Sequence, residues 1–82
     1  ARGLAYESLT KGGNMACIMN AANEAAVAAY LKGEIGFYDI TDVVARCMAE
    51  GPFVKNPDLE TIFQTNDEAY KLASGIIGKI AR

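Results

Sequence analysis

The sequence contains no histidine and no tryptophan among its 82 residues, and only two cysteines and two prolines. Without histidine, any catalytic base would have to be a carboxylate, a lysine or a tyrosine. Zinc sites in proteins are built mainly from His and Cys ligands. Because the two cysteines are far apart and form no C-x-x-C pair, the sequence predicts no zinc site.

The two cysteines, Cys17 and Cys47, each fall within a helical pattern. Disulfides are rare in the cytosol, whereas free cysteines there are often buried like small apolar residues. Two buried thiols are therefore the favoured interpretation, and a disulfide between them stays open as the alternative.

A strong charge of either sign and a long apolar run are also missing. Eight Lys and Arg against ten Asp and Glu give a net charge of −2. The basic residues are scattered, so we expect neither nucleic acid nor a membrane surface as a partner. The longest apolar run, Ala25 to Leu31, is far shorter than the ~20 residues that span a bilayer.

The chain opens on Ala1 without an initiator Met and shows no signal peptide, and we interpret it as a fragment.

The sequence does have helical periodicity along most of its length. Residues Arg2 to Lys11 are expected to form a short helix that ends at Gly12. A second helix should run from Met15 to Lys32, with Asn14 as its N-cap and Gly33 at its end. This helix is apolar nearly all round, which is typical of a buried central helix.

The connection Glu34 to Asp39 is expected to fold its large apolar side chains under the bundle: Ile35, Phe37 and Tyr38. Asp39 is predicted to cap a third helix that ends at Gly51-Pro52. The apolar positions of that helix follow the spacing i, i+3, i+4, i+7 and i+8: Ile40, Val43, Val44, Cys47 and Met48.

After this helix, Asn56-Pro57 should begin a separate helical turn. Thr65 and Glu68 then match the T-x-x-E capping box of a last helix. No segment alternates with the period of a strand. The sequence therefore predicts an all-α fold, a small bundle of four main helices with short loops, as one domain over residues 1–82.

Two glycine motifs could suggest ligand binding. Gly12-Gly13-Asn14 precedes a helix N-terminus, which can hold an anion. Its spacing matches neither a P-loop nor a dinucleotide fingerprint, so a helix end followed by a turn is favoured. The stretch GIIG, Gly75 to Gly78, has the form of an RNA-binding KH loop, but it lies in a helical pattern without preceding basic residues. We interpret it as a thinned helix surface.

The stretch NAANE places Asn20, Asn23 and Glu24 on one side of the apolar second helix. If these groups are buried, each unpaired one costs about 1–3 kcal/mol, so they should find partners in the connection Gly33 to Asp39. We interpret them as a structural clamp. The alternative is a substrate or metal site, for which two amides and one carboxylate are a poor ligand set. The other carboxylates are expected at helix caps or on solvated faces, so no catalytic, cofactor-binding or metal-binding residue is predicted.

Four segments together carry a family signature: LAYESLTKGG (Leu4 to Gly13), MNAANEAAVAAYLKGEIGFYDI (Met19 to Ile40), Val43-Val44, and LETIFQTNDEAYKLA (Leu59 to Ala73). They cover nearly the whole chain, which resembles the C-terminal domain of the 1-deoxy-D-xylulose 5-phosphate reductoisomerase family. Met19 and Tyr30 stand where that family more usually has Leu and Phe.

The resemblance implies a parent enzyme that converts 1-deoxy-D-xylulose 5-phosphate to 2-C-methyl-D-erythritol 4-phosphate in the non-mevalonate route to isoprenoids. It implies NADPH and Mg or Mn as cofactors of that parent. It also implies a homodimer of chains with a Rossmann-type domain, a catalytic domain and this helical domain, in the bacterial cytoplasm or a plastid.

The family's cofactor motif, metal-binding carboxylates and substrate-binding residues lie upstream of the matching segment, and none maps onto a residue here. We therefore expect an accessory domain that binds no cofactor, has no activity of its own and contacts the upstream domains of the same chain. A free-standing helical protein-interaction module is the alternative.

Overall fold

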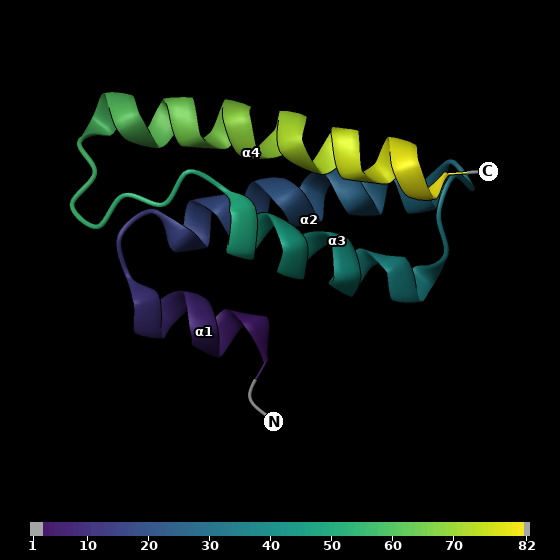
Figure 1. Ribbon diagram of the computed structural model, residues 1–82, viewed down its shortest axis with the longest axis horizontal. Coiled ribbons are helices and arrows are strands. Elements are labelled where there is room, and N and C mark those ends of the chain that lie inside the picture. The colour runs from purple at the N-terminus through teal and green to yellow at the C-terminus, as the bar shows by residue number, and fades with distance from the viewer. Residues whose placement is uncertain (1–2, 82) are drawn as a thin grey trace.

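The computed structural model describes residues 3–81 and contains four α-helices: α1 (Leu4–Lys11), α2 (Met15–Leu31), α3 (Phe37–Glu50) and α4 (Leu59–Ile80). Successive helices run in opposite directions, and α2 lies in the middle of the bundle (Figure 1). No strand occurs between residues 3 and 81. The predicted all-α bundle of four main helices with short loops is confirmed; Arg2, predicted to begin the first helix, lies outside the described residues.

The central helix α2 packs against each of the other three helices. Its buried side is formed mostly by alanines, whose small side chains let α3 and α4 approach closely. The core residues from α2 and its neighbours are Met15, Ile18, Ala21, Ala22, Ala25, Ala26, Ala29, Val43, Val44, Cys47, Met48, Ala69, Ala73, Ile76 and Ile77. In contrast, Ser8 is the one fully buried residue of α1. Helix α1 is therefore a peripheral element, as its position at the edge of Figure 1 also shows.

The start of α3 differs from the prediction. Gly36, not Asp39, is the N-cap, and the Asp39 carboxylate accepts a hydrogen bond from the Gly36 N–H at 2.7 Å. Because the helix begins at Phe37, its first turn directs Phe37 and Tyr38 outward, and they are 63% and 85% exposed. The expectation that these two rings are buried is wrong, whereas Ile35 is buried as expected.

The start of α4 also differs. Asp58 caps a continuous helix by accepting a hydrogen bond from the Thr61 N–H at 2.8 Å. Asn56 and Pro57 belong to the non-helical linker before it. Thr65 lies inside this helix and is buried, so the predicted capping box is wrong. The Thr65 hydroxyl instead donates to the Thr61 carbonyl oxygen of the same helix at 2.7 Å.

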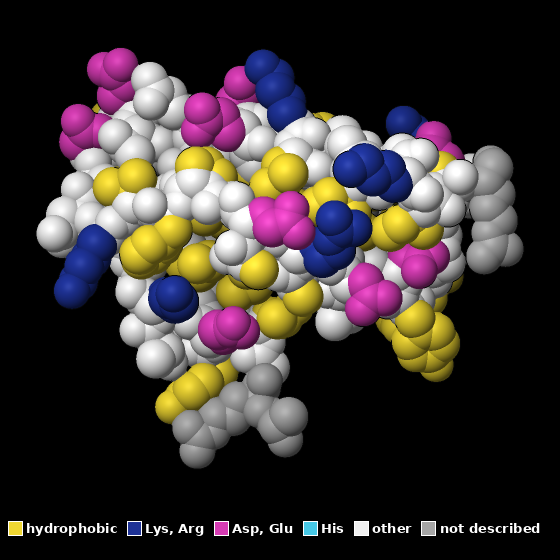
Figure 2. Space-filling view, viewed as in Figure 1, with side chains coloured by type: hydrophobic (Ala, Val, Ile, Leu, Met, Phe, Trp, Pro, Cys, Tyr) yellow, Lys and Arg dark blue, Asp and Glu magenta, His cyan; other side chains and the backbone are white. Residues whose placement is uncertain are grey.

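The surface carries charges of both signs without segregation. Figure 2 shows Lys and Arg side chains interspersed with Asp and Glu over the visible face, with hydrophobic side chains between them. Among residues 3–81, two exposed ion pairs join residues four apart in a helix, Arg46 with Glu50 and Lys71 with Asp67. Exposed pairs of this kind contribute only about 0–1 kcal/mol each, so the stability of the bundle rests on its core.

Candidate functional site

Asn14 is fully buried and connects three parts of the chain through its side chain. Its Nδ2 donates to the Pro52 carbonyl oxygen and to Thr65 Oγ1, both at 2.8 Å. Its Oδ1 accepts from the Val54 N–H at 2.7 Å. The backbone N–H of Asn14 also donates to the Val54 carbonyl oxygen at 3.1 Å. Asn14 therefore holds the linker between α3 and α4 against the start of α2.

The sequence placed Asn14 correctly at the start of α2, but its side chain makes no capping hydrogen bond. The partners that bury it come from the linker and from α4, which are far away in the sequence. No local pattern distinguishes such an asparagine from an ordinary N-cap. A structural polar clamp does exist in this domain, but it is centred on Asn14 rather than on the residues predicted to form it.

The residues predicted to form the clamp, Asn20, Asn23 and Glu24, are all exposed, so the expectation that they are buried is wrong. The buried alanines of α2 face α3 and α4, which leaves these three on another side of the helix. Among the described residues, the connection before α3 is held by backbone hydrogen bonds instead of by these side chains. One of them runs from the Glu34 N–H to the Ala29 carbonyl oxygen at 3.0 Å. A structural role for the three residues stays a prediction.

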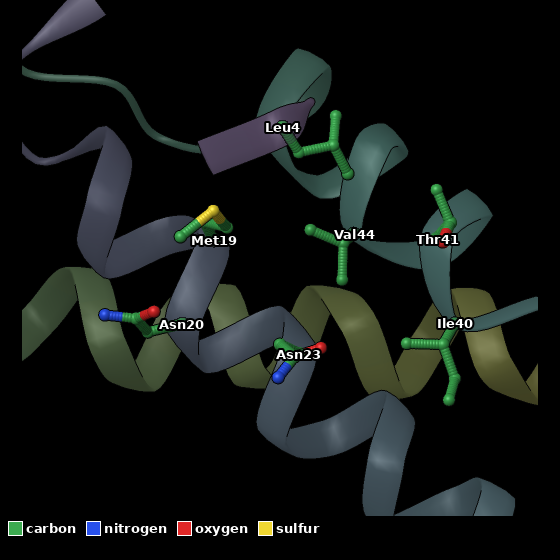
Figure 3. Close-up of a pocket in the computed structure, with 7 residues that line it drawn as sticks. All are labelled: Leu4, Met19, Asn20, Asn23, Ile40, Thr41 and Val44. Atoms are coloured by element: carbon green, nitrogen blue, oxygen red, sulfur yellow. The ribbon is translucent and has the colours of Figure 1, made fainter. Parts of the chain in front are cut away.

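Asn20 and Asn23 line a groove of about 270 Å³ where α1, α2 and α3 meet, which we call the α2–α3 groove (Figure 3). Its lining comes from all three helices: Leu4, Met19, Asn20, Asn23, Ile40, Thr41 and Val44. None of these side chains carries a charge or titrates near neutral pH. The groove therefore offers apolar surface and neutral hydrogen-bonding groups, which suit binding rather than proton transfer.

Exposed aromatic rings continue this side of the domain beyond the groove. Tyr30 and Phe37 are in edge-to-face contact with ring centroids 5.7 Å apart, and Phe37 and Tyr38 are also 5.7 Å apart. Tyr30 lies seven residues after Asn23 on α2, and Phe37 lies four residues before Thr41 on α3. Helical spacings of four and seven keep residues on the same side, so the aromatic rings extend the α2–α3 groove.

The titratable groups with shifted pKa values lie outside the groove. Burial raises the pKa of the Cys47 thiol, and the nearby Glu50 charge raises it further. Hydrogen bonds from the hydroxyl and backbone N–H of Thr61 lower the pKa of Asp58. Cys17 and Cys47 are both free thiols; Cys17 is only half-buried, whereas Cys47 is fully buried.

Residues 3–81 contain neither a metal-binding cluster nor a membrane-spanning helix. No group of three or more His, Cys, Asp or Glu side chains in this part of the chain is arranged to hold a metal ion. None of the four described helices combines the length and the apolar character that crossing a membrane requires.

Comparisons with known proteins identify relatives of the chain. The model of the DXP reductoisomerase C-terminal domain family matches residues 1–72. The 1-deoxy-D-xylulose 5-phosphate reductoisomerase of Bacteroides fragilis is 46% identical over 76 residues, which are 93% of this chain and 20% of the relative. The enzyme of the same name from Macrococcus caseolyticus is 46% identical over 68 residues, 83% of this chain and 18% of the relative.

The enzyme of that name from Listeria monocytogenes is 45% identical over 65 residues, 79% of this chain and 17% of the relative. The chain thus spans about a fifth of the length of the curated relatives it matches. No solved structure matches the chain. Since the family model covers most of its residues, the chain belongs to the DXP reductoisomerase C-terminal domain family.

Proposed function

We propose that this chain is the structural C-terminal domain, a single unit over residues 1–82, of a 1-deoxy-D-xylulose 5-phosphate reductoisomerase. The observation that carries the proposal is the 46% identity to an enzyme of that name over 93% of the chain. The matched region is only 20% of that relative, and the matching family is described as its C-terminal domain. The rest of the enzyme would supply the chemistry.

The parent enzyme would convert 1-deoxy-D-xylulose 5-phosphate to 2-C-methyl-D-erythritol 4-phosphate with NADPH and Mg or Mn, as a homodimer in the cytoplasm or a plastid. The partners of this domain would be the catalytic and NADPH-binding domains of the same polypeptide. Asn20, Asn23 and Glu24 would be structural residues at the contact with those domains. Their exposure on α2 supports this role, because exposed side chains are available to a neighbouring domain.

The domain itself would be catalytically silent. The α2–α3 groove is lined by uncharged side chains, so it lacks the carboxylates that Mg prefers as ligands. The turn at Gly12-Gly13 is followed by a buried asparagine that already bonds to the linker, so it does not present a free phosphate-binding loop. Both features support a role in packing rather than in catalysis.

Calorimetric titration with NADPH tests whether this domain contributes to the cofactor site. The full-length enzyme should bind NADPH saturably, and residues 1–82 alone should release no binding heat at the same concentrations. Saturable micromolar binding by the isolated domain would place part of the cofactor site here.

Deleting this domain from the full-length enzyme tests whether the domain supports the structure of the enzyme. The shortened chain should give less folded protein and a lower melting temperature. An unchanged melting temperature together with unchanged turnover would contradict a supporting role.

A further inference from the structure

We propose that the α2–α3 groove is the surface through which this domain docks onto the part of the same polypeptide that precedes it. This inference rests on the proposed function. The occupant would be an extended segment that places an apolar side chain in the groove and pairs its backbone with Asn20 and Asn23.

The central helix α2 is incompletely covered within this domain. Helix α2 is packed by α1, α3 and α4, yet one of its sides still faces solvent. That side includes Leu31, 76% exposed, and Tyr30, 39% exposed, beside Phe37 at 63%. A helix that is apolar nearly all round is usually buried, so the open side of α2 is suited to cover by another domain.

The side chains that line the α2–α3 groove have the composition of a protein–protein contact. Contact cores between protein surfaces are poor in charge and rich in aromatic and apolar side chains. The α2–α3 groove has this composition, with no charged residue among its lining and exposed aromatic rings at one end. Figure 3 shows the two asparagines on α2 and the apolar side chains of α1 and α3 around the same space.

Asn14, the N-cap residue of α2, shows within this domain how an asparagine side chain can hold an extended segment. Its amide donates to the Pro52 carbonyl oxygen and accepts from the Val54 N–H, so one side chain pairs with both kinds of backbone group. Asn20 and Asn23 have the same donors and acceptors. At the edge of an apolar groove, they can pair with the backbone groups that an inserted segment would otherwise leave unsatisfied.

The relatives indicate why the occupant belongs to the same polypeptide. The matched region is 17–20% of their length, and the family is described as a C-terminal domain, so most of each relative lies outside the matched region. A domain tethered to that remainder meets it at a high effective concentration, which favours contact within the chain over contact between chains. A second copy of this domain seated in the groove is the alternative that the experiment must exclude.

Thiol labelling of the full-length enzyme tests the proposal. Asn23→Cys and Asn20→Cys probe the groove, and Asn66→Cys on α4 is the matched control, because all three asparagines are exposed in this domain. Labelling is followed peptide by peptide with mass spectrometry, in native buffer and in urea, so that native cysteines do not interfere. The two groove variants should react at least tenfold more slowly than Asn66→Cys in native buffer and equally fast in urea.

A photoreactive benzophenone maleimide attached to Asn23→Cys identifies the occupant. The cross-linked peptide should come from the chain that precedes this domain. Equal native labelling at Asn23→Cys and Asn66→Cys would overturn the proposal, and so would a cross-link to this domain in a second copy. Slow labelling only at Asn66→Cys would overturn the groove as the docking surface while leaving the proposed function intact, because the domain would then dock through α4.

Discussion

The side-chain amide of Asn14 donates a 2.8 Å hydrogen bond to Thr65 Oγ1, although the two residues are 51 positions apart. Asn14 is 0% exposed and Thr65 is 2% exposed. The Thr65 hydroxyl in turn donates a hydrogen bond to the Thr61 carbonyl oxygen. This buried polar link fixes the end of the first loop against the N-terminal part of α4.

The first prediction concerns this link. Asn14→Ala should lower the free energy of unfolding by about 2–4 kcal/mol, because it removes three side-chain hydrogen bonds, of which the one to Thr65 is fully buried. Thr65→Val removes one acceptor but leaves the bond to Pro52, so its cost should be nearer ~1 kcal/mol. Urea unfolding of both variants and of the double variant measures the coupling. A coupling energy near zero would mean that the two residues act independently.

The second prediction compares two adjacent glycines. Both have positive φ, 69° at Gly12 and 56° at Gly13, so alanine at either should cost about 1–3 kcal/mol from backbone strain. An added Cβ at Gly12 meets nothing, whereas one at Gly13 would clash with the Val54 carbonyl oxygen and lie 2.9 Å from Lys55 Cα. Gly13→Ala should therefore lower the melting temperature clearly more than Gly12→Ala. Equal decreases in melting temperature for the two variants would show that the linker shifts to make room for the added methyl group.

The third prediction concerns the stability of the domain at acidic pH. The pKa of Asp58 in the folded domain is below its ordinary value of 3.8, because Thr61 donates hydrogen bonds to the carboxylate. A lowered folded pKa gives a stabilising contribution that is present above the unfolded pKa and is lost as pH falls through the folded value. Melting curves from neutral pH down to about pH 2 should thus show a steeper loss for wild type than for Asp58→Asn, whose cap does not titrate. Parallel pH profiles would rule out this contribution.

The fourth prediction concerns the two thiols. The pKa of Cys47 is raised by burial, and the thiolate is the reactive form, so Cys47 should react with iodoacetamide at least about tenfold more slowly than half-buried Cys17. The two rates should converge in urea. Because the folded pKa of Cys47 is raised, stability should also fall as pH rises above about 9, and Cys47→Ala should lose this dependence. Faster native labelling at Cys47 would contradict its burial.

The fifth prediction concerns the exposed asparagine and glutamate of α2. In the isolated domain, Asn23→Ala and Glu24→Ala should change the free energy of unfolding by no more than about 0.5 kcal/mol, because exposed substitutions away from special features cost little. In the full-length enzyme, Asn23→Ala should lower the melting temperature while the kinetic constants of the folded protein stay nearly unchanged. A hundredfold loss of turnover with an unchanged melting temperature would instead assign Asn23 to the active site, since it corresponds to about 2.7 kcal/mol.

The sequence by itself determined the helices and the central position of α2. Gly12 and Gly33 marked two helix ends because their positive φ values suit glycine, and both lie where the periodic pattern stops. The spacing of Val43, Val44, Cys47 and Met48 identified the buried side of α3, since a helix places residues three and four apart on one face. These features depend on residues close together in the chain.

Only the tertiary structure decided which polar residues are buried. Asn14 at the N-cap of α2 and Asn20 within α2 are both asparagines of one apolar segment, but Asn14 contacts the linker and α4 while Asn20 faces an open groove. That difference is set by contacts with segments distant in sequence, which a local pattern does not contain. The same reason explains Thr65, whose T-x-x-E pattern fits a helix start equally well but whose side chain is buried and hydrogen-bonded to the distant Asn14.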